Sequence, residues 1–205
     1  NSKNNINFNY DFSIAIFGKP NAGKSTLVNG ILGYTRSVTS PIAGTTSDIV
    51  EDYFTYKNNS FKILDTAGIY KKKLISKDSV NYQSIKMSFN IIKNIDMSLL
   101  LIDSKDGFDN QVKKIINILL NKSNSVIILF NKIDLIRNKA NFIKEIKNQA
   151  EYTFSKSKNI SFIFLSAKKK SDITKLKNTI LLKTQISSIN IKTSKINQWL
   201  KKVTN

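Results

Sequence analysis

The chain has 205 residues, a formal net charge of +19 at pH 7, 40% hydrophobic residues, and neither cysteine nor histidine. A chain of this length and apolar content can bury one sizeable core, which excludes disorder over its whole length. The missing residue types exclude disulfides, thiolate metal sites, histidine-bound zinc and catalytic triads that use an imidazole base.

Strand and helix patterns alternate along the chain. In chain order they predict a strand at 12–17, a helix at 25–32, a strand at 49–56, a turn at 58–60, a strand at 61–65, a helix at 79–95, a strand at 97–103, a helix at 110–120, a strand at 125–130, a helix at 139–154, a strand at 160–166 and a helix at 172–184. Strands joined by helices predict an α/β fold with a six-stranded, mostly parallel sheet covered by helices on both faces. The hairpin at 49–65 adds an antiparallel edge.

The pattern changes after Gln185, where a short link precedes an amphipathic stretch that includes Trp199 and Leu200. Either a terminal helix docks on the sheet domain, or a second domain begins here. We divide the chain into a domain at 1–185 and a segment at 186–205. The chain begins without Met, so we expect a piece of a longer protein.

No targeting or membrane segment is recognised in the sequence. The first residues are polar and lack the apolar region of a signal peptide, and no apolar run reaches the roughly 18 residues of a membrane span. We therefore expect a cytoplasmic protein without membrane contact.

The segment “GKPNAGKS”, residues 18–25, matches the motif G-x-x-x-x-G-K-[ST] and lies between a predicted strand and a predicted helix. Its glycines allow backbone N–H groups to turn inward around phosphates at a helix N-terminus. We expect Lys24 to reach the β- and γ-phosphates and Ser25 to give its hydroxyl to magnesium. A plain glycine turn is the alternative.

The segment “NKID” follows the strand at 125–130 and predicts recognition of a guanine base. The Asp134 carboxylate can accept from guanine N1–H and the 2-amino group, whereas adenine would leave it unpaired, a difference of about 10⁴-fold or more. We expect Asn131 to face the N7/O6 edge and Lys132 to pack across the phosphate loop. Backbone amides of “SAK”, residues 166–168, could meet guanine O6.

Two further segments resemble the nucleotide-sensing parts of a switch. In “DTAGI”, Asp65 can hold magnesium through water, and the Gly68 amide can meet the γ-phosphate. In “IAGTTSD”, residues 42–48, Thr46 or alternatively Thr45 could complete the magnesium shell.

With these five motifs in order, the chain resembles a translation-factor-type small GTPase domain of the P-loop NTPase class over nearly its whole length. More closely, it is similar to the second GTPase domain of the bacterial tandem-GTPase ribosome-assembly family Der (EngA). The supporting stretches are “GKPNAGKSTLVN”, “IAGTTSD”, “DTAGIYKKKL”, “SVNYQSIKMSFNIIKNIDMSLLLID” and “TSKINQWL”. In that family the last stretch leads into a KH-like domain that engages ribosomal RNA, so residues 186–205 would be a linker and the start of a truncated KH-like domain.

The resemblance also implies how hydrolysis is assisted. Ile69 stands where Ras-like proteins carry the Gln that orients water, and Ser47 stands where the family usually has Arg. Related GTPases with a hydrophobic residue after “DTAG” include some that bind potassium, and Asn21 matches their potassium ligand. We therefore expect potassium stimulation, with Lys24, Asn21, Thr46 and Gly68 as the catalytic residues.

The complete set of candidate nucleotide-binding residues comes from these motifs. They are Gly18, Lys19, Pro20, Asn21, Ala22, Gly23, Lys24, Ser25, Thr26, Asp65, Thr66, Ala67, Gly68, Ile69, Asn131, Lys132, Asp134, Ser166, Ala167 and Lys168. The magnesium ligands would be Ser25, Thr46 and Asp65, and the potassium ligand Asn21. Asp103 and Asp106 are interpreted as turn caps without a catalytic role.

The expected function is a GTP-binding and GTP-hydrolysing switch in large ribosomal subunit biogenesis, with GTP or GDP and Mg as cofactors and K as an activator. The expected partners are GTP and, through the full-length protein, ribosomal RNA; we expect a monomer. The positive charge supports an RNA partner, but only Arg36 and Arg137 among the 33 basic residues are arginines, so we expect the mutational bias of an AT-rich genome to account for part of the charge. The alternatives are the GTPase domain of an MnmE-like tRNA-modifying enzyme, a nucleotide-sensing module that does not hydrolyse GTP, and an ATPase.

Overall fold

A computed structural model describes residues 9–34, 50–65, 95–122, 125–155 and 160–203. The elements in chain order are β1 (Phe12–Gly18), α1 (Lys24–Leu32), β2 (Val50–Tyr56), β3 (Asn59–Asp65), β4 (Met97–Asp103), α4 (Asn110–Lys122), β5 (Val126–Asn131), the short 3₁₀ helix η1 (Ile133–Leu135), α5 (Lys139–Phe154), β6 (Ile160–Phe164) and α6 (Lys170–Val203). The helix predicted at 79–95 lies outside the described residues, apart from its last residue.

The strands form one six-stranded sheet in the order β2-β3-β1-β4-β5-β6. Only β2 and β3 pair in antiparallel fashion, and the other neighbours run parallel. The predicted fold, a mostly parallel sheet with one antiparallel edge, is confirmed.

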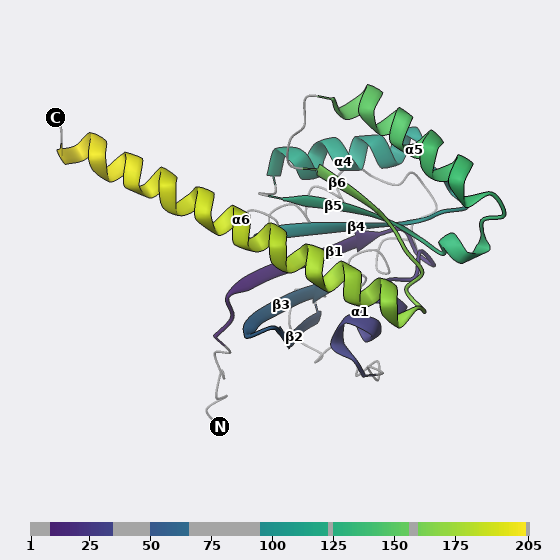
Figure 1. Cartoon of the computed structure of the whole chain (residues 1–205), viewed down its shortest axis with the longest axis horizontal. Coiled ribbons are helices and arrows are strands. Elements are labelled where there is room, and N and C mark those ends of the chain that lie inside the picture. Colours follow the sequence, from purple (N-terminus) through teal and green to yellow (C-terminus); the bar gives the residue numbers. More distant parts are fainter. Residues whose placement is uncertain (1–8, 35–49, 66–94, 123–124, 156–159, 204–205) are drawn as a thin grey trace, which may run out of the picture.

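Helices cover both faces of the sheet (Figure 1), with α1 and α6 on one side and α4 and α5 on the other. The alternation of side chains along β1 explains this arrangement. Ile14 and Ile16 belong to the core under α1 and α6, together with Leu27. Ala15 and Phe17 point the other way and belong to the core under α4 and α5. The central strand β1 is apolar from Ile14 to Phe17 because it is buried on both faces.

The last helix differs from its prediction. Helix α6 runs for 34 residues without a break, so the short link expected after Gln185 is wrong. The sequence from 170 to 203 contains neither Gly nor Pro, so nothing in it stops a helix. The second half of α6 projects beyond the sheet (Figure 1). The assignment of 186–205 to the start of a KH-like domain stays a prediction.

None of the helices in the described part of the chain is long and apolar enough to cross a membrane.

The hairpin between β2 and β3 turns one residue earlier than predicted. Lys57 and Asn58 both have positive φ, at 48° and 61°, and Tyr56 pairs with Asn59 on either side of them. Two central residues with positive φ form the turn that matches the twist of a two-residue hairpin.

Candidate functional site

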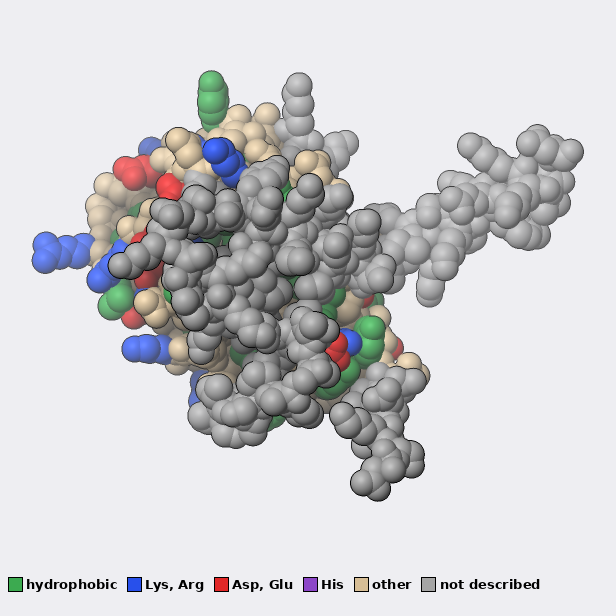
Figure 2. Space-filling view, turned by 180° about the vertical axis from the view of Figure 1, so that it is seen from behind, with side chains coloured by type: hydrophobic (Ala, Val, Ile, Leu, Met, Phe, Trp, Pro, Cys, Tyr) green, Lys and Arg blue, Asp and Glu red, His purple; other side chains and the backbone are tan. Residues whose placement is uncertain are grey.

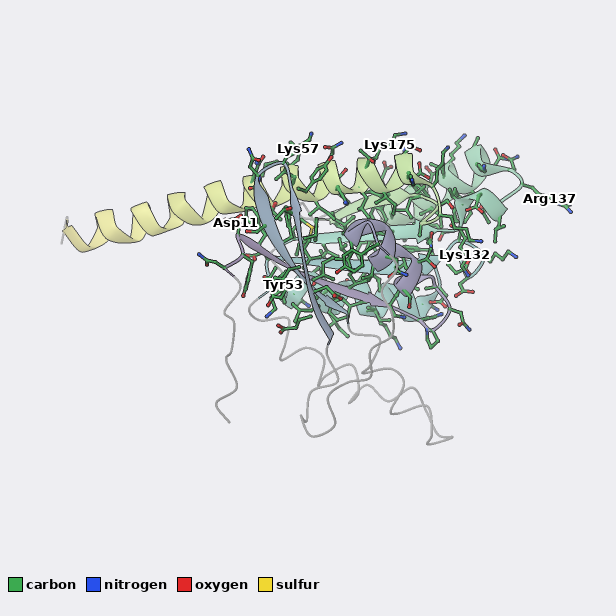
Figure 3. The ribbon with its side chains drawn as sticks, turned by 90° about the horizontal axis from the view of Figure 1, so that it is seen from below. Asp11, Tyr53, Lys57, Lys132, Arg137 and Lys175 are labelled. Atoms are coloured by element: carbon green, nitrogen blue, oxygen red, sulfur yellow. The ribbon has the colours of Figure 1, made fainter. Side chains whose placement is uncertain are left out.

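Five strands run parallel and end at one edge of the sheet, namely β1, β3, β4, β5 and β6. Ligands of open α/β sheets bind at such an edge. Figure 3 shows Lys132 at this end of the sheet, far from Asp11 at the start of β1. In Figure 2, acidic and basic side chains lie together at the end of the molecule away from the projecting α6.

The loop between β1 and α1 is wrapped around the side chain of Lys24. This side chain is buried, with 7% exposure, and its Nζ donates to the backbone oxygens of Gly18 and Lys19 at 2.7 and 2.8 Å. Helix α1 begins at Lys24, directly after Gly23 in the left-handed conformation. The positive end of α1 and the buried ammonium group of Lys24 thus lie in one loop, an arrangement that fits a phosphate chain.

Gly23 also allows another segment to approach closely. Its φ is +98°, and a Cβ placed there would lie 2.3 Å from Nδ2 of Asn131. No side chain could replace this glycine without moving the “NKID” segment. The phosphate loop and the predicted base-recognition segment are therefore in direct contact.

Asn131 holds three loops together. Its side chain is almost fully buried, its Nδ2 donates to the Ala22 carbonyl at 2.8 Å, and its Oδ1 accepts from the Ala167 N–H at 2.9 Å. A buried amide with both ends satisfied is well fixed. The amide thus faces the “SAK” loop and the phosphate loop, and its predicted contact with the base stays a prediction.

Lys132 crosses to the phosphate loop. Its Nζ donates to the Asn21 carbonyl at 2.8 Å and contacts Oδ2 of Asp103 at 2.6 Å. Lys132 and Asn21 both have positive φ, at 61° and 64°. Two non-glycine residues in this rarely adopted conformation face each other across the site.

Asp134 presents an ionised acceptor. A hydrogen bond from the Ser166 side chain holds the pKa of the Asp134 carboxyl below its usual value, although partial burial opposes this. The residue is exposed, so the carboxylate can meet a ligand. Ser166 is itself buried, and its N–H donates to Asp172 at 3.0 Å. The structure thus brings the “NKID” and “SAK” segments together.

The remaining predicted residues are described in part or not at all. Ser25 and Thr26 are exposed in the first turn of α1, and Pro20 and Lys168 are exposed in their loops. Asp65 ends β3, opposite Ile16 of β1, and only its backbone is described. Thr45, Thr46, Thr66, Ala67, Gly68 and Ile69 lie outside the described residues.

Three acidic residues beside the site were missed or underestimated by the sequence analysis. Asp103 contacts Lys132, Asp109 pairs with Lys19 at 3.0 Å, and Asp172 fixes the Ser166 backbone. The sequence interpretation of Asp103 as a turn cap is correct, since its Oδ1 accepts from the Lys105 N–H, but incomplete. The sequence shows only that Asp103 ends a predicted strand, whereas its place beside Asn131 follows from the strand order of the fold.

A loop with the phosphate-binding motif lies between β1 and α1, and a segment with the guanine-recognition motif follows β5, two strands away on the same edge of the sheet. This arrangement defines the P-loop GTPase class. The comparisons agree: a family model described as 50S ribosome-binding GTPase matches residues 13–132. Since this is more than half of the chain, the chain belongs to the 50S ribosome-binding GTPase family and is a GTPase domain.

Among the relatives, GTPase Der of Fusobacterium nucleatum subsp. nucleatum is 40% identical over 153 residues, covering 73% of this chain and 34% of that protein. GTPase Der of Mycoplasma mycoides subsp. mycoides is 35% identical over 202 residues, covering 98% of this chain and 46% of that protein. The chain thus spans about a third to a half of these relatives.

A similar solved structure is Era in complex with MgGDPNP and nucleotides 1506–1542 of 16S ribosomal RNA. It is 32% identical, has a TM-score of 0.63, and the match covers 84% of this chain and 56% of that one.

Proposed function

We propose that this chain is the nucleotide-operated switch of a longer Der-like protein that acts in assembly of the large ribosomal subunit. The observation that supports this proposal most strongly is that the phosphate loop closes around Lys24 and is hydrogen-bonded to the side chain of Asn131. In this proposal Lys24, Asn21, Thr46 and Gly68 assist hydrolysis by positioning and by offsetting charge, because the chain has no histidine to serve as a base. The nucleotide is bound by the residues of the five motifs given above.

Base choice is the first test of the proposal. Titration calorimetry of the chain with magnesium should show GDP and GTP binding and no ADP binding. Asp134→Asn should weaken GDP binding by roughly 100-fold or more and improve xanthosine diphosphate binding, because the amide exchanges an acceptor for a donor. Equal binding of GDP and ADP by the wild-type chain would contradict guanine recognition and favour an ATPase.

Magnesium would be held by Ser25, Thr46 and Asp65. When bound, a magnesium ion offsets the charge of the β- and γ-phosphates. The exposed Ser25 in the first turn of α1, beside Lys24, fits this role. Ser25→Ala should weaken binding of a GTP analogue more in magnesium than in EDTA, while equal weakening in both would argue against a Ser25 ligand.

Potassium stimulation is proposed on the basis of Asn21, whose side chain is exposed in the phosphate loop. Multiple-turnover phosphate release should be faster in potassium than in sodium, and Asn21→Asp should remove the difference. Phosphate release that is equally slow in both salts would contradict the potassium site. Tight GTP binding without any release would favour a sensing module over an enzyme.

The partner is proposed to be ribosomal RNA of the large subunit, reached through the full-length protein. The 50S ribosome-binding family and the Der relatives support the large subunit. The Era complex, whose 16S ribosomal RNA belongs to the small subunit, and the net charge of +19 support an RNA partner in general. The full-length protein should sediment with large subunits in the presence of a GTP analogue and much less with GDP. A cytoplasmic location and a monomeric state belong to the same proposal, and light scattering tests the latter.

A further inference from the structure

The ammonium group of Lys132 lies between two oxygen atoms from different parts of the chain. Nζ is 2.8 Å from the Asn21 carbonyl oxygen in the phosphate loop and 2.6 Å from Oδ2 of Asp103 at the end of β4. The Asp103 side chain is largely buried, at 15% exposure, and the Lys132 side chain is at 32%. A charged pair that is partly shielded from water is stronger than one on the open surface.

Asp103 is itself firmly held. Its Oδ1 accepts from the Lys105 N–H at 3.0 Å, and its carbonyl accepts from the Asp106 N–H at 2.9 Å. The next residue, Ser104, is buried and donates to the Asn131 carbonyl through both N–H and hydroxyl, at 2.9 and 2.6 Å. The end of β4 therefore makes polar contacts with the first two residues of the “NKID” segment, Asn131 and Lys132.

The state of the carboxyl group agrees with this geometry. Burial would raise the pKa of Asp103, but hydrogen bonds from the Lys132 ammonium and the Lys105 N–H outweigh it and lower the pKa. The group is therefore ionised at neutral pH and faces the ammonium as a charge.

The conformation of Lys132 is costly and has to be stabilised by contacts. Its backbone is in the left-handed conformation, at φ 61°, which L-amino acids rarely adopt. Its long side chain also loses rotamer freedom when it is held across the phosphate loop. The carboxylate of Asp103 offsets both costs before a nucleotide arrives, and the ligand then has less ordering to provide.

We propose that Asp103 is a positioning residue for nucleotide binding, acting through Lys132 to hold the phosphate loop and the “NKID” segment in their binding geometry. This rests on the proposed function as a GTP-binding domain. Asp109 makes a parallel but weaker contact from the same loop, because the exposed fractions in its pair with Lys19 are 34% and 41%.

The test is GDP binding by Asp103→Asn, measured as affinity and dissociation rate. Asparagine keeps an oxygen for the Lys105 N–H and so keeps the turn, but it removes the charge that faces Lys132. We expect about tenfold weaker binding, with most of the change in the dissociation rate. The matched control Asp106→Asn removes the same charge from an exposed position in the same loop and should change binding less than twofold.

A double-mutant cycle with Lys132→Met separates positioning from a general structural effect. If Asp103 acts through Lys132, Asp103→Asn should weaken GDP binding tenfold in the wild-type background and less than twofold in Lys132→Met. Thermal unfolding without nucleotide should stay cooperative for Asp103→Asn, with a lower melting temperature than for Asp106→Asn because the partly shielded pair with Lys132 is lost.

An equal loss in both backgrounds, or no loss in the wild-type background, would overturn the inference while leaving GTP binding intact. Absence of GDP binding by the wild-type chain would overturn the proposed function, and this inference with it.

Discussion

At the scale of single residues, Gly23 lies too close to Asn131 to accept a side chain without a rearrangement. Gly23→Ala should destabilise the chain by more than 2 kcal/mol, because left-handed strain costs roughly 1–2 kcal/mol and the new Cβ would also meet Asn131. Urea unfolding without nucleotide measures the loss, and GDP titration should show weakened binding because Asn131 is displaced.

Gly33 supplies the control for this prediction. Its φ is +84°, and a Cβ there would meet nothing within 4 Å. Gly33→Ala should therefore show the backbone strain alone, about 1 kcal/mol, without an effect on GDP binding. Equal losses of stability at both positions would contradict the close contact between Gly23 and Asn131.

Asp11 makes a pH-dependent contribution at the opposite edge of the sheet. Its carboxylate accepts from the Ser60 N–H at 2.7 Å and the Ser60 hydroxyl at 2.9 Å, and the backbone bond, followed by the hydroxyl bond, lowers the pKa. Because the folded-state pKa is lowered, the stabilisation is present above the ordinary value of 3.8 and is lost as pH falls through the lowered value.

The free energy of unfolding of wild type and Asp11→Asn should therefore differ most at neutral pH and converge as the pH falls below the lowered pKa of Asp11. Denaturant unfolding across this range measures the difference. Ser60→Ala, which keeps the backbone donor, should reduce the pH dependence only in part. A constant difference between pH 3 and pH 7 would show that the charge of Asp11 does not matter.

At the scale of elements, the β2–β3 hairpin has a turn that its sequence does not favour. Asn58 has φ 61°, and glycine adopts this conformation without a Cβ penalty. Asn58→Gly should raise the free energy of unfolding by roughly 0.5 kcal/mol, and Asn58→Ala should lower it by about 1 kcal/mol. Opposite signs in urea unfolding would support the turn at 57–58, whereas two neutral substitutions would favour the turn first expected at 58–60.

Some features of the elements can be predicted from the sequence and others cannot. Strand and helix positions follow from the 2.0 and 3.6 residue periods, and the phosphate loop follows from a local motif with its flanking elements. The partners of Asp103 do not follow, because its contact with Lys132 depends on which strands are neighbours. The change in apolar spacing after Gln185 predicts a break, but without Gly or Pro between 170 and 203 the backbone continues as one helix.

At the scale of the whole molecule, the last helix extends beyond the sheet. The buried residues of α6 are Ile173, Leu176, Ile180, Leu181 and Thr184 among those whose side chains are described. The part of α6 after them projects beyond the sheet (Figure 1). Removal of residues 188–205 should therefore change the melting temperature by less than about 3 °C, a shift that corresponds to roughly 1 kcal/mol or less.

Calorimetric unfolding of the shortened and complete chains measures this, with GDP affinity as the second readout. Replacement of Leu176 by Ala is the matched control within the buried part of α6 and should cost about 2–5 kcal/mol. A large loss on truncation would mean that residues 188–205 stabilise the sheet domain.

The length of α6 has a mechanical consequence. The helix starts three residues after Ala167, whose N–H is bonded to Asn131, and its 34 residues extend for about 50 Å. A tilt of about 5° at its first turn would carry its far end through roughly 4 Å over that distance. Because the helix starts beside the loop that is predicted to contact the base, a small rearrangement of that loop would be amplified into a displacement of several ångströms at the far end of α6.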